Sequence, residues 1–274
     1  MSNLPDFVKS IDLPEYRYKY SICTLVTQKQ EYTEMLESFI KGGFDPADCE
    51  FLIADNSAAN KVDAYTGLNS FLQSAKGEYI ILCHQDILLT EHSTRSILQK
   101  RINEMDALHP NWAVLGNAGA APRLYKKLSI KISYPNGFVD VKGKQPARVC
   151  SVDENFMVVK NAANLALSGN IGGYHLYGLD ICMTAEMLGY TCHVIDFLLI
   201  HKSLGNIDYS FDQTVERTRK KYALFFKGRY LNTTIATFYI SGSAFKNRLY
   251  TTKLFKRIFK NVERINVFYK KLIN

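Results

Sequence analysis

The chain has no apolar run that approaches the ~20 residues needed to span a bilayer. Its apolar runs, such as those at residues 79–83 and 197–200, are far shorter. The first ten residues, MSNLPDFVKS, also lack the basic stretch and apolar core of a signal peptide. These two absences predict a protein that stays in the cytoplasm and has no membrane-spanning helix.

Cysteine patterns for metal binding or redox chemistry are also missing. The six cysteines form no CxxC pair and no zinc-type spacing. Several lie in apolar, strand-like runs, so we expect reduced thiols that pack as small hydrophobic side chains. The sequence has no repeats, and its 47% hydrophobic and 22% charged residues are ordinary for a globular protein. A chain of 274 residues then forms one large domain or two small ones.

The net charge of +8 is unevenly distributed. Residues 244–274 contain nine Lys or Arg and one acid, whereas the first 243 residues contain 25 basic and 25 acidic residues. A nucleic-acid-binding protein would be basic more widely, so we expect no nucleic acid partner. A neutral body with a basic tail indicates a local docking surface.

Strand-like and helix-like segments alternate through the first half of the chain. The predicted strands cover residues 20–27, 50–54, 78–83 and 112–115. The predicted helices cover residues 31–41, 62–76 and 91–108. This alternation predicts an α/β fold with a mostly parallel, Rossmann-like central sheet and helices on both faces.

Polar residues follow three of these strands. They are Thr27 and Gln28, the cluster Asp55-Asn56-Ser57, and the cluster His84-Gln85-Asp86. The carboxyl ends of parallel strands share one edge of a sheet, and ligands bind there. The sequence therefore predicts one site at that edge.

The second half of the chain is less regular. Residues 128–149 are rich in Lys, Gly, Pro and β-forming residues, which indicates a hairpin insertion. Further strands are predicted at 151–159 and 191–195, and helices at 161–167 and 179–188. We expect a first domain over residues 1–205, followed by a basic, mainly helical extension over residues 206–274.

Residues 69–86, NSFLQSAKGEYIILCHQD, resemble the nucleotide-binding half of family 2 glycosyltransferases of the GT-A fold. His84-Gln85-Asp86 stands where that family has its acidic D-x-D motif, and this variant resembles a bacterial glycosyltransferase-like subgroup with HQD instead. Further motifs of the subgroup are matched in order at residues 116–120 (GNAGA), 152–159 (VDENFMVV), 177–182 (YGLDIC) and 201–203 (HKS). The resemblance covers roughly residues 21 to 203.

This resemblance implies the GT-A fold and an inverting transfer of a sugar from a nucleotide-sugar donor. The donor would be linked to UDP, GDP or dTDP, and the acceptor would be a hydroxyl of a glycan or a lipid-linked glycan in cell-surface polysaccharide synthesis. The residues implied to hold the donor are Thr27, Asp55, Asn56, Asn69, His84, Gln85 and Asp86. Among them, Asp55 occupies the place of the acid that reads the nucleobase.

The departing nucleoside diphosphate carries negative charge, which a divalent cation stabilises well. Asp86 is the best candidate ligand and His201 the second, and Mn²⁺ or Mg²⁺ suits such a site. His84 lacks the negative charge of the acid that it replaces. We therefore do not count it as a ligand and expect it to hydrogen-bond the ribose or a phosphate.

The acceptor hydroxyl requires a general base. By resemblance this is Asp180, the only carboxylate left in a motif that usually has two or three acids. Glu154 and Asp153 on the preceding strand are the alternatives. The secondary candidates, around the acceptor, are Asp153, Glu154, His175, Tyr177 and Lys202.

Residues 252–273 show the cleanest helical periodicity in the chain. Nine apolar residues fall on one face and six Lys or Arg on the opposite face. Such a helix suits an anionic membrane surface, here the inner face of the cell membrane. The alternative is that its apolar face packs on the body of the protein or on a second subunit in a homodimer.

Two other functions stay open. Leu179 and His84 replace acids of the family, which is compatible with a catalytically degenerate protein that binds a nucleotide or a membrane. A sugar nucleotidyltransferase has a similar sheet, but its first loop is rich in Gly, Arg and Lys. Residues 27–30 read TQKQ and contain no glycine.

Overall fold

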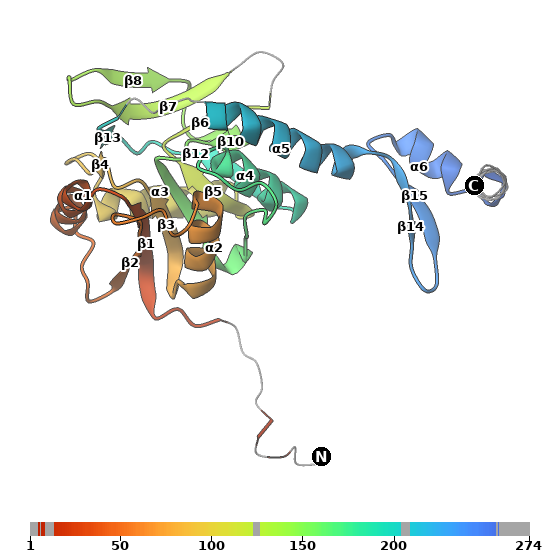
Figure 1. Cartoon of the computed structure of the whole chain (residues 1–274), viewed down its shortest axis with the longest axis horizontal. Helices are drawn as coiled ribbons and strands as arrows, with labels where there is room; N and C mark the ends of the chain where they lie inside the picture. Colours follow the sequence, from red (N-terminus) through yellow and green to blue (C-terminus); the bar gives the residue numbers. More distant parts are fainter. Residues whose placement is uncertain are drawn as a thin grey trace. The chain divides into compact units, whose positions relative to one another are not determined.

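The computed structural model of the chain describes residues 5, 7–8, 14–122, 127–203, 209–255 and 257. Packing divides the chain into two compact units, Met1–Val215 and Glu216–Asn274 (Figure 1). The predicted boundary between residues 205 and 206 falls in a segment outside the described residues and stays a prediction. Most of the helix predicted at 252–273 also lies outside them.

The first unit is built on a seven-stranded sheet (Figure 1). Its strands, in spatial order, are β2 (Cys49–Asp55), β1 (Tyr18–Val26), β3 (Gly77–Cys83), β11 (Phe156–Lys160), β5 (Trp112–Gly116), β12 (Thr191–Val194) and β9 (Ala147–Val149). Only β11 and β9 run against the other five. The predicted α/β fold with a mostly parallel sheet is therefore confirmed.

Helices pack on both faces of this sheet. α1 (Lys29–Lys41) and α3 (Arg95–Leu108) bury Phe39 and Ile102 in the same core as Ile22 of β1. Side chains alternate along a strand, so Leu25 of β1 points to the opposite face. There α2 (Ala64–Ser74) lies so close that a Cβ on its Gly67 would collide with Leu25.

A second sheet adjoins the first. Its strands, in order, are β10 (Ser151–Val152), β6 (Ala118–Ala120), β7 (Leu128–Ser133), β13 (Leu199–His201) and β4 (Ile87–Leu88), and β8 (Val139–Lys142) pairs with β7. β7 and β8 form the predicted hairpin insertion. Antiparallel pairing of β13 with β4 sets His201 opposite Ile87. This pairing brings a residue from the end of the unit beside the HQD segment.

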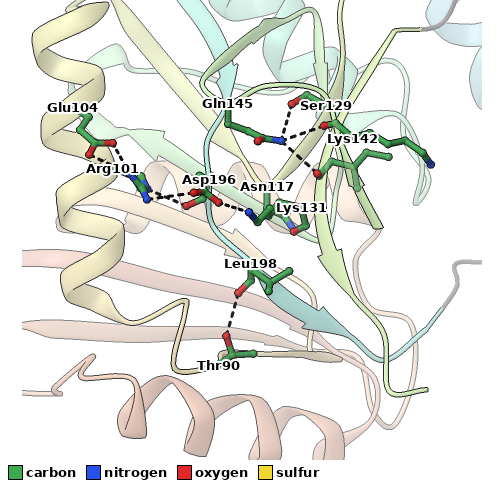
Figure 2. Close-up of polar contacts among 11 residues, drawn as sticks. Thr90, Arg101, Glu104, Asn117, Ser129, Lys131, Lys142, Gln145, Asp196 and Leu198 are labelled. Atoms are coloured by element: carbon green, nitrogen blue, oxygen red, sulfur yellow. Dashed lines mark hydrogen bonds and ion pairs between the residues drawn. The ribbon is translucent and has the colours of Figure 1, made fainter. Parts of the chain in front are cut away.

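Polar contacts anchor the base of the insertion (Figure 2). Lys131 Nζ lies 2.8 Å from Asp196 Oδ1, and Arg101 Nη2 lies 3.3 Å from Asp196 Oδ2. Gln145, which follows β8, donates a hydrogen bond from its Nε2 to Ser129 Oγ of β7 at 3.2 Å. The carboxylate of Asp196 thus pairs with Lys131 of the insertion and with Arg101 of α3, and it links the insertion to α3.

Two local predictions are wrong. The strand predicted at 151–159 is two strands, because Asp153 Oδ1 accepts a hydrogen bond from Asn155 N and turns the chain between them. The helix predicted at 161–167 is only a 3-10 turn, Asn161–Ala163, which Asn164 ends with a left-handed φ of 50°. The predicted helical extension also contains a β-hairpin.

In the second unit this hairpin consists of β14 (Arg229–Asn232) and β15 (Thr237–Ile240). It follows α5 (Tyr209–Phe226), whose last part belongs to the second unit, and it precedes α6 (Ala244–Tyr250). Across the described ranges, no helix combines the length and apolar character needed to cross a membrane. All six cysteines are unpaired thiols, and five of them are buried, as predicted.

Candidate functional site

A cavity of about 270 Å³ opens at the carboxyl ends of β1, β2 and β3. Thr27, Asn56 and the HQD segment line it from these three strand ends, in agreement with the prediction of one shared edge. The remaining lining residues are Leu25, Ala64, Leu68, Leu82, Cys83, Glu154, Met157, Tyr174 and Tyr177. Tyr174 and the α2 residues Ala64 and Leu68 could not be predicted from the sequence. No local pattern marks which residues of a helix or loop face a cavity.

Gln85 ties the end of β3 to the end of β1. Its Oε1 accepts hydrogen bonds from the backbone N–H groups of Thr27 and Gln28, at 2.8 and 2.9 Å. Its Nε2 donates to Thr27 Oγ1 at 2.9 Å and to Glu31 Oε2 at 3.1 Å. The Gln85 amide therefore positions two walls of the cavity.

Asp55 and Asn56 shape the loop after β2. Asp55 Oδ1 accepts hydrogen bonds from Ser57 N and Ser57 Oγ, which, with the nearby charge of Lys29, lower the pKa of Asp55 to about 2. Asn56 is buried and bonds to the backbone of Lys61 and Val62. Asp55 is thus an ionised acceptor at the loop, although it is not among the residues that line the cavity.

His84, Asp86 and His201 form a compact cluster, of which His84 and Asp86 line the cavity. Asp86 Oδ1 lies 3.7 Å from His84 Nδ1 and 3.4 Å from His201 Nε2. The side chains of Asp86 and His201 are only 14% and 11% exposed. Burial alone would raise the pKa of Asp86, but the hydrogen bond and charge of His201, together with His84, outweigh burial and lower it.

These three residues fit a divalent cation. One ligand atom from each lies within 4.8 Å of the others. A cation with bonds of about 2.1 Å holds neighbouring ligand atoms roughly 3 to 3.5 Å apart, close to the two separations found here. Two imidazoles and one carboxylate suit Mn²⁺, Co²⁺, Fe²⁺ or Zn²⁺ better than Mg²⁺, which prefers oxygen ligands. His84, which was not expected to be a ligand, is thus a third candidate metal ligand beside Asp86 and His201.

Tyr177 orients His84 for such a role. His84 Nε2 and Tyr177 Oη lie 2.8 Å apart, and Tyr177 is buried. With the ring hydrogen on Nε2 and donated to Tyr177, the lone pair of Nδ1 faces Asp86. A hydrogen bond to the second ring nitrogen is the usual way in which proteins orient a ligating histidine.

Glu154 brings a second carboxyl group to the cavity. It lies in the turn between β10 and β11, and its Oε1 accepts a hydrogen bond from Gly178 N, 3.2 Å away at the start of α4 (Tyr177–Met187). Only glycine fits at position 178, because a Cβ there would collide with the carbonyl of Val152. Burial raises the pKa of Glu154 to about 8. A carboxyl group with this pKa accepts a proton more readily than an ordinary one near neutral pH.

Asp180, the predicted general base, does not line the cavity. It points into the protein from the first turn of α4 and is fully buried. Its Oδ1 accepts a hydrogen bond from Ser168 Oγ at 2.6 Å and its Oδ2 one from Ser168 N at 2.7 Å. The two hydrogen bonds from Ser168 to the Asp180 carboxylate hold the loop before α4 in place.

Asn69 and His175 also bond to the protein rather than line the cavity. The Asn69 amide makes two hydrogen bonds with the backbone of Leu167. The backbone carbonyl of His175 accepts a hydrogen bond from Tyr65 Oη, and its ring packs on Phe211. Asn69, predicted to hold the donor, and His175, predicted near the acceptor, are therefore not among the residues that line this cavity.

Asp153 and Lys202 lie at the edge of the site. Asp153 is exposed and caps the turn before β11, where its Oδ1 accepts from Asn155 N. Lys202 Nζ lies 2.8 Å from Glu34 Oε2, while its backbone N–H donates to the carbonyl of Asp86. That backbone bond helps to hold β13 against the HQD segment.

No known family model matches the chain. The chain is 31% identical over 252 residues to a protein of Fuscovulum blasticum named ATP synthase subunits region ORF 6, across 90% of this chain and all of that protein. Its fold resembles mannosyltransferase PcManGT from Pyrobaculum calidifontis in complex with GDP-Man and Mn²⁺, with a TM-score of 0.50, 11% identity and coverage of 77% of this chain and 66% of that one. It also resembles GalNAc-T7 with UDP, GalNAc and Mn²⁺, with a TM-score of 0.51, 8% identity and coverage of 74% and 48%.

The chain thus spans about two thirds of PcManGT and about half of GalNAc-T7. At such low identity these likenesses establish the fold, which is the GT-A fold. The predicted fold class is confirmed.

Proposed function

Because the chain belongs to the family of the Fuscovulum blasticum ORF 6 protein and has the GT-A fold, we propose that it is a glycosyltransferase. It transfers a sugar, with inversion, from a UDP-, GDP- or dTDP-linked donor to a hydroxyl of a glycan or lipid-linked glycan. The family name describes a genomic region and no activity, so the proposal depends on the site. We further propose that the chain is a family 2 enzyme, because its His84-Gln85-Asp86 segment resembles that family.

One observation carries this proposal. The cluster of His84, Asp86 and His201 lies at the same cavity as a carboxyl group with a raised pKa, at the carboxyl edge of the sheet. A nucleotide-sugar transferase needs positive charge to stabilise the leaving diphosphate and a base to accept the proton of the incoming hydroxyl. The cluster could hold a cation for the first task, and the carboxyl group suits the second.

Asp86, His201 and His84 would hold a divalent cation, which would supply positive charge for the departing diphosphate. The acceptor oxygen forms its bond to the anomeric carbon as the bond from that carbon to the diphosphate oxygen breaks. The acceptor proton passes to the carboxylate of Glu154, which replaces Asp180 as the proposed general base. Thr27, Asn56 and Gln85 form the walls for the nucleotide, with Asp55 at the nucleobase end.

Calorimetric titration tests donor binding directly. UDP, GDP and dTDP are titrated into the full chain with and without Mn²⁺, and into Asp86→Ala. The matched control is Glu91→Ala, whose side chain is 87% exposed on the surface. Metal-dependent binding of one nucleotide to wild type and control, lost in Asp86→Ala, supports the proposal. Absence of nucleotide binding with any cation refutes it.

A catalytically degenerate homologue is the second candidate. The burial of Asp180 favours it, because the acid predicted from the motif is unavailable to a substrate. The two candidates differ in one measurement, since a degenerate protein binds the nucleotide but leaves the donor intact when an acceptor is present. Release of the nucleoside diphosphate, monitored by a coupled enzyme, separates them.

We also propose a location for this activity. A lipid-linked acceptor would place the protein at the inner, cytoplasmic face of the cell membrane. The basic amphipathic segment at residues 252–273 would contribute to docking there. Transfer to a lipid-linked acceptor in vesicles should then exceed transfer to its soluble analogue.

A further inference from the structure

Positive charge is concentrated in the second compact unit. Residues 216–274 contain fifteen Lys or Arg and two Glu, whereas the first 215 residues contain nineteen Lys or Arg and 24 acids. Between Glu216 and Glu263 there are twelve basic residues and no acid. Exposed cations of the hairpin and α6 region are Lys227, Arg229, Lys246, Arg248 and Lys253. This unit therefore presents positive charge that no acid of its own hairpin or α6 neutralises.

The β14–β15 hairpin of this unit has two different faces. On one face Tyr239 packs edge-on against Tyr250 of α6, with ring centroids 4.9 Å apart, and Tyr230 Oη donates to the carbonyl of Tyr250 at 2.9 Å. Figure 1 shows α6 beside the hairpin. Because side chains alternate along a strand, the residues next to these tyrosines in each strand point away from α6.

That opposite side, which we call the outer face, is apolar. It carries the cross-strand pair Leu231 and Phe238, and beside it Ile240 opposite Arg229. Phe238 and Ile240 are 39% and 46% exposed, and Ile235 in the turn is 95% exposed. An exposed apolar tip and face, in a unit with a large excess of Lys and Arg, marks a binding surface.

We infer that the outer face and the Ile235 turn dock on an anionic lipid bilayer. Anionic lipid headgroups would neutralise the Lys and Arg side chains of this unit. The apolar side chain of Ile235 would be buried in the membrane interface. A second copy of the chain fits less well, because two such basic units repel each other. A nucleic acid would neutralise the cations but leave Ile235, Phe238 and Ile240 in water. This inference deepens the membrane location proposed above and assigns docking to the hairpin in addition to residues 252–273.

Vesicle sedimentation of the full chain tests the inference. The vesicles are phosphatidylcholine mixed with phosphatidylglycerol, or phosphatidylcholine alone. Ile235→Asn changes a side chain that is almost fully exposed, so folding is preserved. Leu108→Asn, at a 61% exposed leucine in the first unit, is the matched control.

We expect wild type and Leu108→Asn to sediment with the mixed vesicles at low salt and not with phosphatidylcholine alone. Ile235→Asn should weaken binding roughly tenfold, the effect of removing one apolar side chain from the interface. Arg229→Gln, which removes the cation of the outer face itself, should weaken it roughly fivefold, with less effect as salt rises.

Two results overturn the inference. If Ile235→Asn binds mixed vesicles as tightly as wild type does, docking by the hairpin is refuted. Light scattering that shows a dimer, which Ile235→Asn dissociates, with no vesicle binding, assigns the face to a second copy. Transfer to a soluble acceptor should be unchanged in Ile235→Asn, so failure of the docking inference and failure of the proposed activity are measured separately.

Discussion

Replacing Glu154 by Gln should change how the stability of the protein depends on pH. Burial raises the pKa of Glu154 to about 8 in the folded chain, whereas an unfolded glutamate has a pKa of about 4.3. Between these values the folded protein keeps the proton and the unfolded chain has lost it. Unfolding then releases a proton, so the free energy of unfolding falls as pH rises. This contribution is complete below the unfolded pKa and is lost by about pH 8.

The magnitude follows from the single proton. One proton corresponds to about 1.4 kcal/mol per pH unit, so two pH units inside this window change the free energy of unfolding by about 2.7 kcal/mol. That is a large part of the roughly 5–15 kcal/mol that stabilises a domain. Glutamine resembles the protonated carboxyl group in shape and does not titrate. Glu154→Gln should therefore gain about this amount relative to wild type between about pH 5.5 and 7.5.

Urea unfolding at several pH values measures the effect. The difference between wild type and Glu154→Gln removes contributions that the two proteins share, including that of His193, whose pKa burial lowers to about 4. Glu91→Gln, at an exposed position, should follow wild type at every pH. If the stability curves of wild type and Glu154→Gln stay parallel, Glu154 is ionised in the folded protein and our account of its buried environment is wrong.

Four further outcomes are expected. In a transfer assay, Glu154→Gln should lower turnover by roughly two to four orders of magnitude with little change in donor affinity, and wild-type turnover should rise with pH up to about 8. Asp86→Ala should abolish metal-dependent nucleoside diphosphate binding and leave the circular dichroism spectrum unchanged; retained manganese dependence would remove Asp86 from the site. His84→Asp should reduce the preference for Mn²⁺ over Mg²⁺ in calorimetry, because it replaces a nitrogen ligand by oxygen, and an unchanged ratio would exclude His84 as a ligand. Asp180→Asn should cost about 1–3 kcal/mol in urea unfolding, because its amide cannot accept both hydrogen bonds from Ser168; loss of turnover without loss of stability would restore Asp180 as the base.

The sequence by itself determined the sheet and the edge on which the site lies. Short runs of β-branched and aromatic residues alternate with amphipathic segments, and each pattern is local. The strand ends could also be located from local pattern. Thr27, Asp55-Asn56 and His84-Gln85-Asp86 each begin where an apolar run ends. Parallel strands then bring these residues to one edge whatever the details of packing.

Contacts between distant segments were decided only by the tertiary structure. The pairing of β13 with β4 places His201 beside Asp86, and a turn between two short strands brings Glu154 under the first turn of α4. The direction of the Asp180 side chain depends on where Ser168 lies, which its motif does not encode. Such pairings depend on how whole strands and helices pack, so neither periodicity nor residue spacing along the chain carries a signal for them.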